Sequence, residues 1–203
     1  ILEYSDFFQC NTFTESVIIT VLPQIDAGSI ISDQILCYDS LATILTMDSL
    51  ASGGDGNFAY QWYSDYSGAW NTIPNEDTTI YSPGYMNTSN SYFLEVVSTH
   101  NLNCISRNTD TIYIEVYDSL NPGSIFSDQI ICYNTTPDAI VFNSSPIGSG
   151  GIYSYQWESS DDDNNWDIMP FENNDTLQLS DLTETTYYRL KVTSDFGCGS
   201  KFT

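Results

Sequence analysis

Basic residues are almost missing from this chain. Its 203 residues include four Lys and Arg and one His against 27 Asp and Glu, which gives a net charge of −23. Proteins bind nucleic-acid backbones and anionic membrane surfaces through clustered Lys and Arg. The composition therefore excludes both as partners. The acidity instead fits solubility, repulsion between neighbouring copies, or binding of divalent cations.

Long apolar runs are lacking as well. No stretch of about 18 apolar residues could span a membrane, and no basic segment followed by an apolar one opens the chain as in a signal peptide. Hydrophobic residues nevertheless make up 41% of the sequence and aromatic residues 14%, more than a disordered chain carries. The chain is expected to fold without inserting into a membrane. Its first and last residues lie inside strand-like runs, so both ends are expected to be cuts through a longer protein.

Catalytic motifs are also missing. The sequence has no Gly-x-Ser-x-Gly elbow, no His-Glu-x-x-His pair and no phosphate-binding glycine loop. Paired carboxylates of the glycosidase kind stay open, because acidic residues are abundant. A small domain repeated in tandem offers no obvious cleft, however, and no enzymatic activity is expected.

What the sequence does contain is an internal repeat. Residues 27–38 (AGSIISDQILCY) return 95 residues later as residues 122–133 (PGSIFSDQIICY). The same offset places the Tyr-Gln-Trp that ends at Trp62 on the one that ends at Trp157. Identities continue in order across the whole period. The recurrence predicts three segments: the C-terminal strands of a preceding repeat at 1–26, a complete repeat at 27–120, and a repeat lacking its last strand at 121–203.

Each repeat has the pattern of about seven short β-strands. Segments such as Phe58–Trp62 and Thr111–Val116 are rich in β-branched and aromatic residues and alternate in part with period two. Clusters of Gly, Ser, Asn and Asp separate them at short intervals. Some seven strands around a central Trp, here Trp62 or Trp157, are typical of an immunoglobulin-like sandwich. The predicted fold is all-β, with tandem immunoglobulin-like sandwich repeats and one disulfide per repeat.

Five cysteines supply that disulfide framework. They stand at Cys10, Cys37, Cys104, Cys132 and Cys198, without the spacing of a zinc site. Their recurrence at equivalent positions favours disulfides over buried thiols, and disulfides imply export to an oxidising compartment. We predict the pairs Cys37–Cys104 and Cys132–Cys198, each pinning one end of a sandwich, with Cys10 bonded to the missing part of the preceding repeat. Such a loop closure stabilises a domain by roughly 4 kcal/mol.

Several sequence words resemble a known group of repeats. Gly-Ser-Ile…Gln-Ile-Cys-Tyr, Tyr-Gln-Trp and Asp-Phe-Gly-Cys resemble the immunoglobulin-like repeats of giant Bacteroidetes cell-surface proteins, and are most similar to those of SprB-type gliding motility adhesins. The resemblance covers the entire chain. It implies type IX secretion, an extracellular filament displayed at the cell surface and carried by the gliding machinery, and attachment to surfaces or polysaccharides.

Exported proteins of that group are O-glycosylated at Asp-Ser or Asp-Thr followed by an apolar residue or Thr, so the resemblance implies modification sites here. The sequence holds six such triplets, with hydroxyl residues Ser40, Ser49, Thr78, Thr111, Ser119 and Thr176. The alternative is that these pairs are simply turn residues.

An acidic run offers a candidate calcium site. Asp161, Asp163 and Asp167 provide carboxylates at near-alternating spacing, and hard cations require several oxygen ligands. The equivalent loop of the first repeat has almost no carboxylates, which favours a solvated hairpin loop instead. No other cofactor is expected.

The leading hypothesis is a stalk segment of a large repetitive adhesin filament, in which each repeat contacts mainly its neighbours in the same chain. Two alternatives stay open. The repeats could themselves bind glycans or neighbouring filaments, through exposed aromatic residues such as Trp70 and Trp166 or through sheet edges. They could also form an accessory β-sandwich of a secreted polysaccharide-degrading enzyme.

Overall fold

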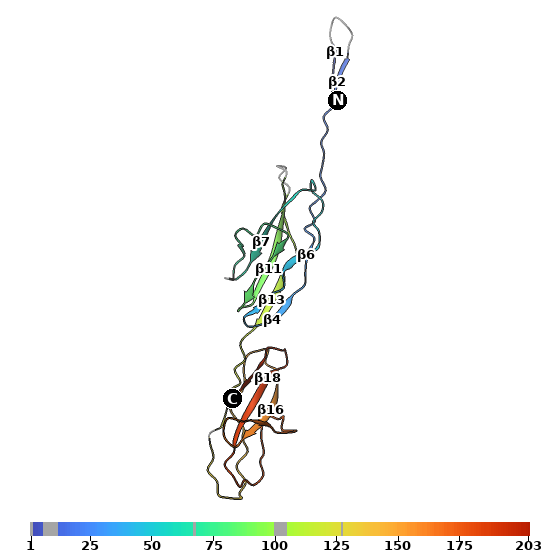
Figure 1. The fold of residues 1–203 in the computed structure, drawn as a ribbon. Coiled ribbons are helices and arrows are strands. Elements are labelled where there is room, and N and C mark those ends of the chain that lie inside the picture. Colours follow the sequence, from blue (N-terminus) through green and yellow to red (C-terminus); the bar gives the residue numbers. More distant parts are fainter. Residues whose placement is uncertain (1, 6–11, 67, 100–104, 127) are drawn as a thin grey trace.

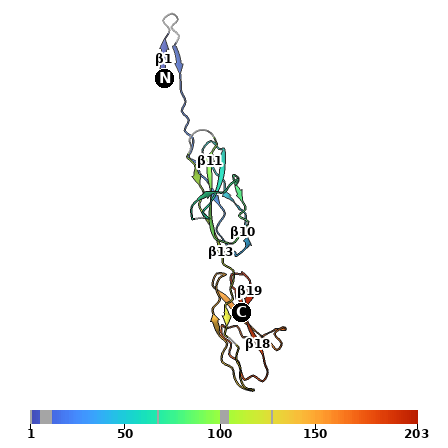
Figure 2. The ribbon, with the colours of Figure 1, turned by 90° about the vertical axis from the view of Figure 1, so that its left-hand side faces the viewer.

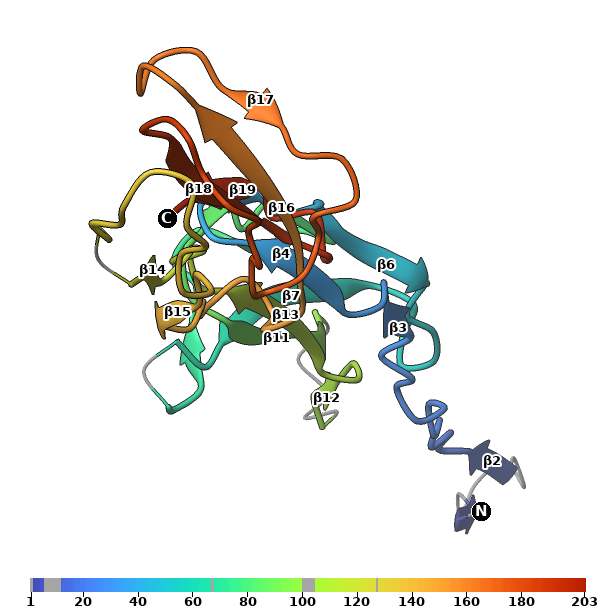
Figure 3. The same ribbon diagram turned by 90° about the horizontal axis from the view of Figure 1, so that it is seen from below.

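The computed structural model describes residues 2–5, 12–66, 68–99, 105–126 and 128–203. Figure 1 shows an elongated molecule, in which a hairpin, a middle domain and a C-terminal domain follow one another along one axis. A quarter-turn about that axis shows the same order (Figure 2). Seen from below, the C-terminal domain lies in front of the middle domain rather than beside it (Figure 3). Within the described ranges, no helix is long and apolar enough to cross a membrane.

The N-terminal segment is a two-stranded hairpin followed by an extended stretch. Strands β1 (Leu2–Ser5) and β2 (Thr12–Glu15) pair antiparallel. The next residues carry no strand pairing, although four of them are apolar and β-branched. Val17, Ile18, Ile19 and Val21 are 85–89% exposed. A segment with this composition normally lies in a sheet, and here it has no partner strand.

The middle domain is a sandwich of short strands. Their bounds are β3 (Ser29–Ile30), β4 (Gln34–Cys37), β5 (Ser40–Leu41), β6 (Leu45–Ser49), β7 (Phe58–Ser64), β8 (Asn71–Thr72), β9 (Ile80–Tyr81), β10 (Tyr85–Met86), β11 (Asn90–Ser98), β12 (Arg107–Asn108) and β13 (Ile112–Tyr117). The larger sheet has the order β4-β13-β11-β7-β8, with β12 also paired to β11. The second layer consists of β3-β6-β9, and β5 pairs with β10.

The direction of β4 decides where its cysteine lies. β4 runs parallel to β13, with Cys37 opposite Tyr117, and β13 runs antiparallel to β11. The C-terminal end of β4 therefore lies at the opposite end of the sandwich from Ser98, which ends β11. Cys37 stands at the end of the middle domain from which the chain leaves toward the C-terminal domain.

A tryptophan occupies the centre of the middle domain, as the sequence predicts. Trp62 is fully buried, and its indole N–H donates to the Thr78 carbonyl at 2.9 Å. In β11 the alternate residues Tyr92, Leu94 and Val96 are buried, which is the period-two pattern of a strand with one covered face. Burial raises the pKa of Tyr92 to about 12, because ionisation inside an apolar core is costly.

The C-terminal domain repeats this plan with fewer strands. Their bounds are β14 (Ser124–Ile125), β15 (Phe142–Ser144), β16 (Tyr153–Ser160), β17 (Asp167–Ile168), β18 (Tyr187–Ser194) and β19 (Ser200–Phe202). The main sheet has the order β17-β16-β18-β19, and β14 pairs with β15. Trp157 is fully buried among Leu177, Leu190 and Val192, and its indole N–H donates to the Asn174 carbonyl.

Strand β4 of the middle domain is among those without a counterpart in the described part of the C-terminal domain. Residues 129–132 correspond to β4 in sequence but form no strand. β4 obtains its ladder of hydrogen bonds from β13, and no described strand occupies the place of β13 in the C-terminal domain. Ile130 is accordingly fully exposed. The fold is nevertheless the predicted one: all-β, with immunoglobulin-like sandwiches in tandem.

Candidate functional site

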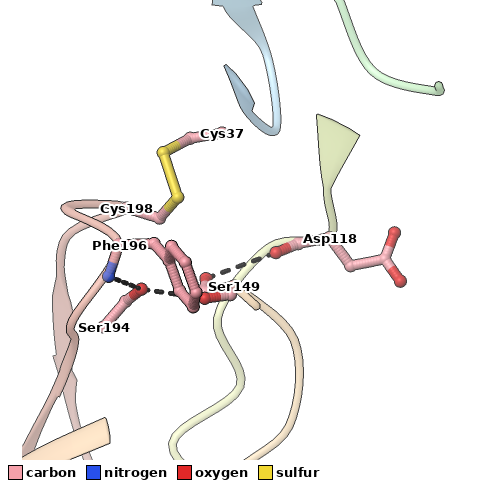
Figure 4. The surroundings of a disulfide bond; sticks show 6 residues. All are labelled: Cys37, Asp118, Ser149, Ser194, Phe196 and Cys198. Carbon is pink, nitrogen blue, oxygen red and sulfur yellow. Dashed lines mark hydrogen bonds between the residues drawn. A yellow bond between two sulfur atoms is a disulfide. The ribbon is translucent and has the colours of Figure 1, made fainter. Parts of the chain in front are cut away.

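A disulfide joins the two domains in addition to the peptide linker. Cys37 and Cys198 are bonded, with their Cα atoms 5.3 Å apart and a sequence separation of 161. Cys37 ends β4 of the middle domain, and Cys198 lies in the turn between β18 and β19 of the C-terminal domain. Figure 4 shows this bond above the linker that connects the domains.

This pairing corrects the prediction from the sequence. The pairs Cys37–Cys104 and Cys132–Cys198 were expected within single repeats, and both are wrong, because Cys37 bonds to Cys198 and Cys132 carries a free, exposed thiol. Cys10 and Cys104 lie outside the described residues. The prediction that Cys10 bonds to a preceding repeat stays a prediction.

Strand direction explains the error. The first cysteine of a repeat ends a strand that runs parallel to β13, and the second follows a strand that runs antiparallel to β13. Cys37 therefore lies at the opposite end of its sandwich from Ser98, the last residue of β11. Cys132 and Cys198 likewise lie at opposite ends of the C-terminal sandwich. The Cys132 carbonyl accepts a hydrogen bond from Thr135, and Thr135 forms a β-bridge with Leu182, shortly before β18 begins. Cys198 instead follows the end of β18.

Hydrogen bonds hold the linker beside the disulfide. The backbone N–H of Ser149 donates to the Asp118 carbonyl at 2.8 Å, and Ser194 Oγ donates to the Ser149 carbonyl at 2.8 Å. Ser149 and Ser194 are 1% and 3% exposed. Buried hydrogen bonds of this kind fix geometry, because breaking one leaves a polar group without water or partner. Asp118, the first linker residue after β13, is thereby fixed to the C-terminal domain.

Apolar contacts add to these bonds. The rings of Tyr117 and Phe196 meet edge to face with centroids 5.0 Å apart. Phe196 lies over Gly150, where a Cβ would collide with the Phe196 ring, so a glycine is required there. Two residues beyond Asp118, Leu120 is 3% exposed and belongs to the core of the C-terminal domain around Trp157. The linker is thus part of the domain that follows it.

The same linker geometry occurs at the other end of the middle domain. Gly54 N–H donates to the Pro23 carbonyl at 3.0 Å, in the manner of Ser149 and Asp118. Ile25 is 5% exposed, as Leu120 is 3%. The bridge Asp26↔Ser52 has its counterpart in Asn121↔Ile147. A segment that precedes the middle domain therefore docks on it as the middle domain's own linker docks on the C-terminal domain.

The hollow at this junction is small. It has a volume of about 150 Å³ and is lined by Cys37, Asp118, Cys198 and Lys201 among others. Sites for small organic ligands are roughly 300–1,000 Å³ in volume. Lys201 Nζ contacts Ser119 Oγ at 3.3 Å across this hollow. This hollow is smaller than such sites, and residues of both domains line it.

The predicted calcium residues lie together on an exposed hairpin loop. Asp161, Asp163 and Asp167 are exposed on and next to the loop that joins β16 and β17. Asp162 organises this loop, since it accepts the backbone N–H groups of Asn164 and Asn165. Those bonds hold the pKa of Asp162 well below its usual range. No group of three or more His, Cys, Asp or Glu suited to a metal occurs among the described residues.

The predicted glycosylation residues lie at separate places on the surface. Of the six, five are exposed and Ser40 is half-buried. Ser49 bonds to Ser29, and Ser119 to Lys201. Their exposure leaves them accessible, and modification at each stays a prediction.

The two tryptophan residues proposed for glycan binding pack against other side chains. Trp70 is 43% exposed and packs against Phe93, with ring centroids 4.6 Å apart. Trp166 lies beneath the guanidinium of Arg189, 4.1 Å from its ring centroid. Arg189 also forms an ion pair with Glu158. Both Trp residues therefore take part in packing on the sheet surface.

One family accounts for both domains. The family described as "Domain of unknown function (DUF8696)" matches residues 26–118 and again residues 121–203, so the chain belongs to this family and carries two consecutive copies of its domain. No curated protein matches the chain in sequence.

Two solved structures align with the chain at low sequence identity. The crystal structure of domains A168-A170 from titin aligns with a TM-score of 0.47 and 12% identity, over 96% of this chain and 68% of that chain. Extracellular domains 3-5 of Drosophila OTK align with a TM-score of 0.33 and 16% identity, over 85% of this chain and 57% of that chain. Identities this low concern the fold alone.

Proposed function

We propose that this chain is a stretch of an extracellular stalk in a large repetitive cell-surface adhesin, in which disulfides between repeats prevent the stalk from lengthening under tension. The observation that carries this proposal is the Cys37–Cys198 bond, which joins consecutive repeats rather than the two ends of one repeat. A disulfide persists in oxidising compartments, which supports a place outside the cytosol. Secretion by the type IX route and movement by gliding machinery belong to the same proposal, on the strength of the sequence resemblance.

The disulfide changes the path of mechanical force through the chain. A pull on the two ends travels from residue 1 to Cys37, crosses the disulfide, and leaves through residues 198–203. Nearly all of both sandwiches lies in the closed loop between the two cysteines. Tension therefore bypasses the cores around Trp62 and Trp157, whereas a within-repeat disulfide would leave the junction between domains to the peptide chain alone.

Single-molecule force spectroscopy tests this function. Pulled between its termini in non-reducing buffer, the protein should show no unfolding event of either sandwich. With a reducing agent present, both sandwiches should unfold and release the 161 residues of the loop, about 530–580 Å of extended chain. Unfolding of a full sandwich without reductant would contradict the proposal. The Cys132→Ser variant is the matched control, since it removes a thiol without touching the bond.

A further inference from the structure

Each repeat of this chain carries two cysteines, and the structure shows the bond that one cysteine from each repeat forms. Cys37, at the C-terminal end of the middle domain, reaches forward to the domain that follows it. Cys198, in the turn after β18, reaches back to the domain before it. Cys132 has the position of Cys37 in the C-terminal domain and is an exposed, free thiol. We infer that Cys132 forms the same bond with the backward-reaching cysteine of a repeat placed after it, so that disulfides link every repeat to the next.

The geometry around Cys37 shows why a following repeat would reach Cys132. Cys37 lies opposite Tyr117, the last residue of β13. The linker begins at Asp118 and is bonded at once to the next domain. A strand equivalent to β13 in the C-terminal sheet would end next to Cys132. The next linker would begin there, and the domain bonded to that linker would lie beside Cys132.

The N-terminal end of the middle domain shows that this junction recurs. Pro23 and Ile25 dock on the middle domain as Asp118 and Leu120 dock on the C-terminal domain. The exposed segment Val17–Val21 lies 95 residues before residues 112–116 of β13, so it precedes Pro23 as β13 precedes Asp118. Two successive junctions therefore have one design. The inference rests on the proposed function and extends it from one bond to a repeating chain of bonds.

Formation of the bond is a two-electron oxidation. The thiols of Cys132 and of its partner lose two protons and two electrons, and the two sulfur atoms become joined. The electrons pass to the disulfide of a thiol oxidoreductase in the exporting compartment, which becomes a dithiol. The bond then closes a covalent route between repeats. The backbone stretch from one backward cysteine to the next forward one, as from Cys104 to Cys132, is roughly 28 residues and at most about 100 Å when extended.

The test extends the whole chain by one repeat. Thr203 occupies the place of Thr109, since each bonds through its hydroxyl to the backbone N–H of the equivalent Leu190 or Leu94. A second copy of residues 110–203 can therefore follow Thr203 directly and supply both the missing strand and a third domain. The appended copy carries Asp195→Glu, which distinguishes its Cys198 peptide by mass, and Cys132→Ser, so that every Cys132 peptide comes from the original domain. After export to an oxidising compartment and alkylation of free thiols, the protein is digested at acid pH without reduction.

The expected result is a peptide of Cys132 joined to the marked Cys198 peptide, with the Cys37 peptide joined to the unmarked one. The Cys132→Ser variant of the extended chain should lose the first link and keep the second. If the appended domain is folded, alkylated Cys132 would overturn the inference, as would a bond from Cys132 to Cys10, to Cys104 or to a second molecule. The force experiment on the chain itself is unaffected by these outcomes, because it depends on Cys37–Cys198 alone.

A second extended chain covers the case in which the appended domain does not fold. Thr14 occupies the same place as Thr109 and Thr203, so residues 15–120 can follow Thr203 instead. The expected partner of Cys132 is then Cys104 of the appended copy, whose peptide an Asn103→Gln marker distinguishes by mass from that of the original Cys104. Tryptophan fluorescence during unfolding shows whether the third domain is folded. Reduced Cys132 in either extended chain, with the third domain of that chain folded, would refute the inference.

Discussion

Replacing both Cys37 and Cys198 by Ser should destabilise both domains together. The double substitution removes the bond and leaves no new free thiol. When one domain unfolds while the other stays folded, the disulfide closes a loop of roughly 80 residues, and the chain-entropy relation gives about 4.5 kcal/mol of lost stabilisation. Each domain is of a size at which 1 kcal/mol changes the melting temperature by about 4–8 °C, so the expected decrease is roughly 20–35 °C.

The two domains share this effect because the bond joins one to the other. A disulfide within a single repeat would stabilise that repeat alone. Differential scanning calorimetry of the wild type in non-reducing buffer should show transitions that both move to lower temperature in the double variant. Small-angle scattering of the folded double variant should also show a broader range of interdomain angles, since the linker contacts at Ser149 and Phe196 remain but the covalent tie is gone.

Two results would refute this reasoning. One is a decrease in melting temperature of less than about 5 °C, which would mean that the bond closes no long loop in the unfolded chain. The other is a large decrease confined to one domain, which would point to a bond within a repeat. The Cys132→Ser variant is the control and should melt as the wild type does, because Cys132 is exposed and unbonded.

Three further predictions follow from other parts of the structure. Gly150→Ala should lower the melting temperature more than Gly151→Ala, since both glycines have positive φ but only at Gly150 would a Cβ meet the Phe196 ring; equal losses would show that Phe196 does not pack there. Appending residues 110–120 after Thr203 should raise the free energy of unfolding of the C-terminal domain by about 3–5 kcal/mol, because two Ile side chains become buried, as Ile112 and Ile114 are in β13. The same extension with Ile114→Asp should raise that free energy little. Urea denaturation followed by Trp fluorescence measures both. The Ser98 hydroxyl lowers the pKa of Asp55 from 3.8 to about 2. Asp55 should therefore contribute stability that is present above pH 4 and is lost as the pH falls through about 2. The difference in melting temperature between wild type and Asp55→Asn should shrink over that range.

The fold could be predicted from the sequence because it depends on local pattern. Period-two alternation in segments such as Asn90–Ser98 survives in the structure as alternate burial, and Trp62 and Trp157 lie fully buried in the two cores. These properties follow from the transfer of apolar side chains out of water, which acts on each strand according to its own residues. The repeat offset of 95 residues predicted a second domain with the same fold as the first.

The disulfide pairing could not be predicted in this way, because the spacing of cysteines says nothing about the direction of strands. Cys37 and Cys104 recur as a pair in sequence, and the recurrence suits a bond inside a repeat as well as a bond between repeats. Parallel pairing of β4 with β13 places Cys37 at the far end of its sandwich. That pairing joins residues 80 apart, such as Gln34 and Ile114, and no local signal marks it.

The amino-acid sequence by itself determined that this chain consists of acidic, all-β repeats with cysteines at equivalent places. Composition and periodicity are properties of each segment, and a single sequence displays them directly. Only the tertiary structure decided which cysteines meet, because that depends on the end of the sandwich at which each strand stops and on the docking of a linker through Asp118 and Leu120. The disulfide that the sequence predicted within each domain joins one domain to the next.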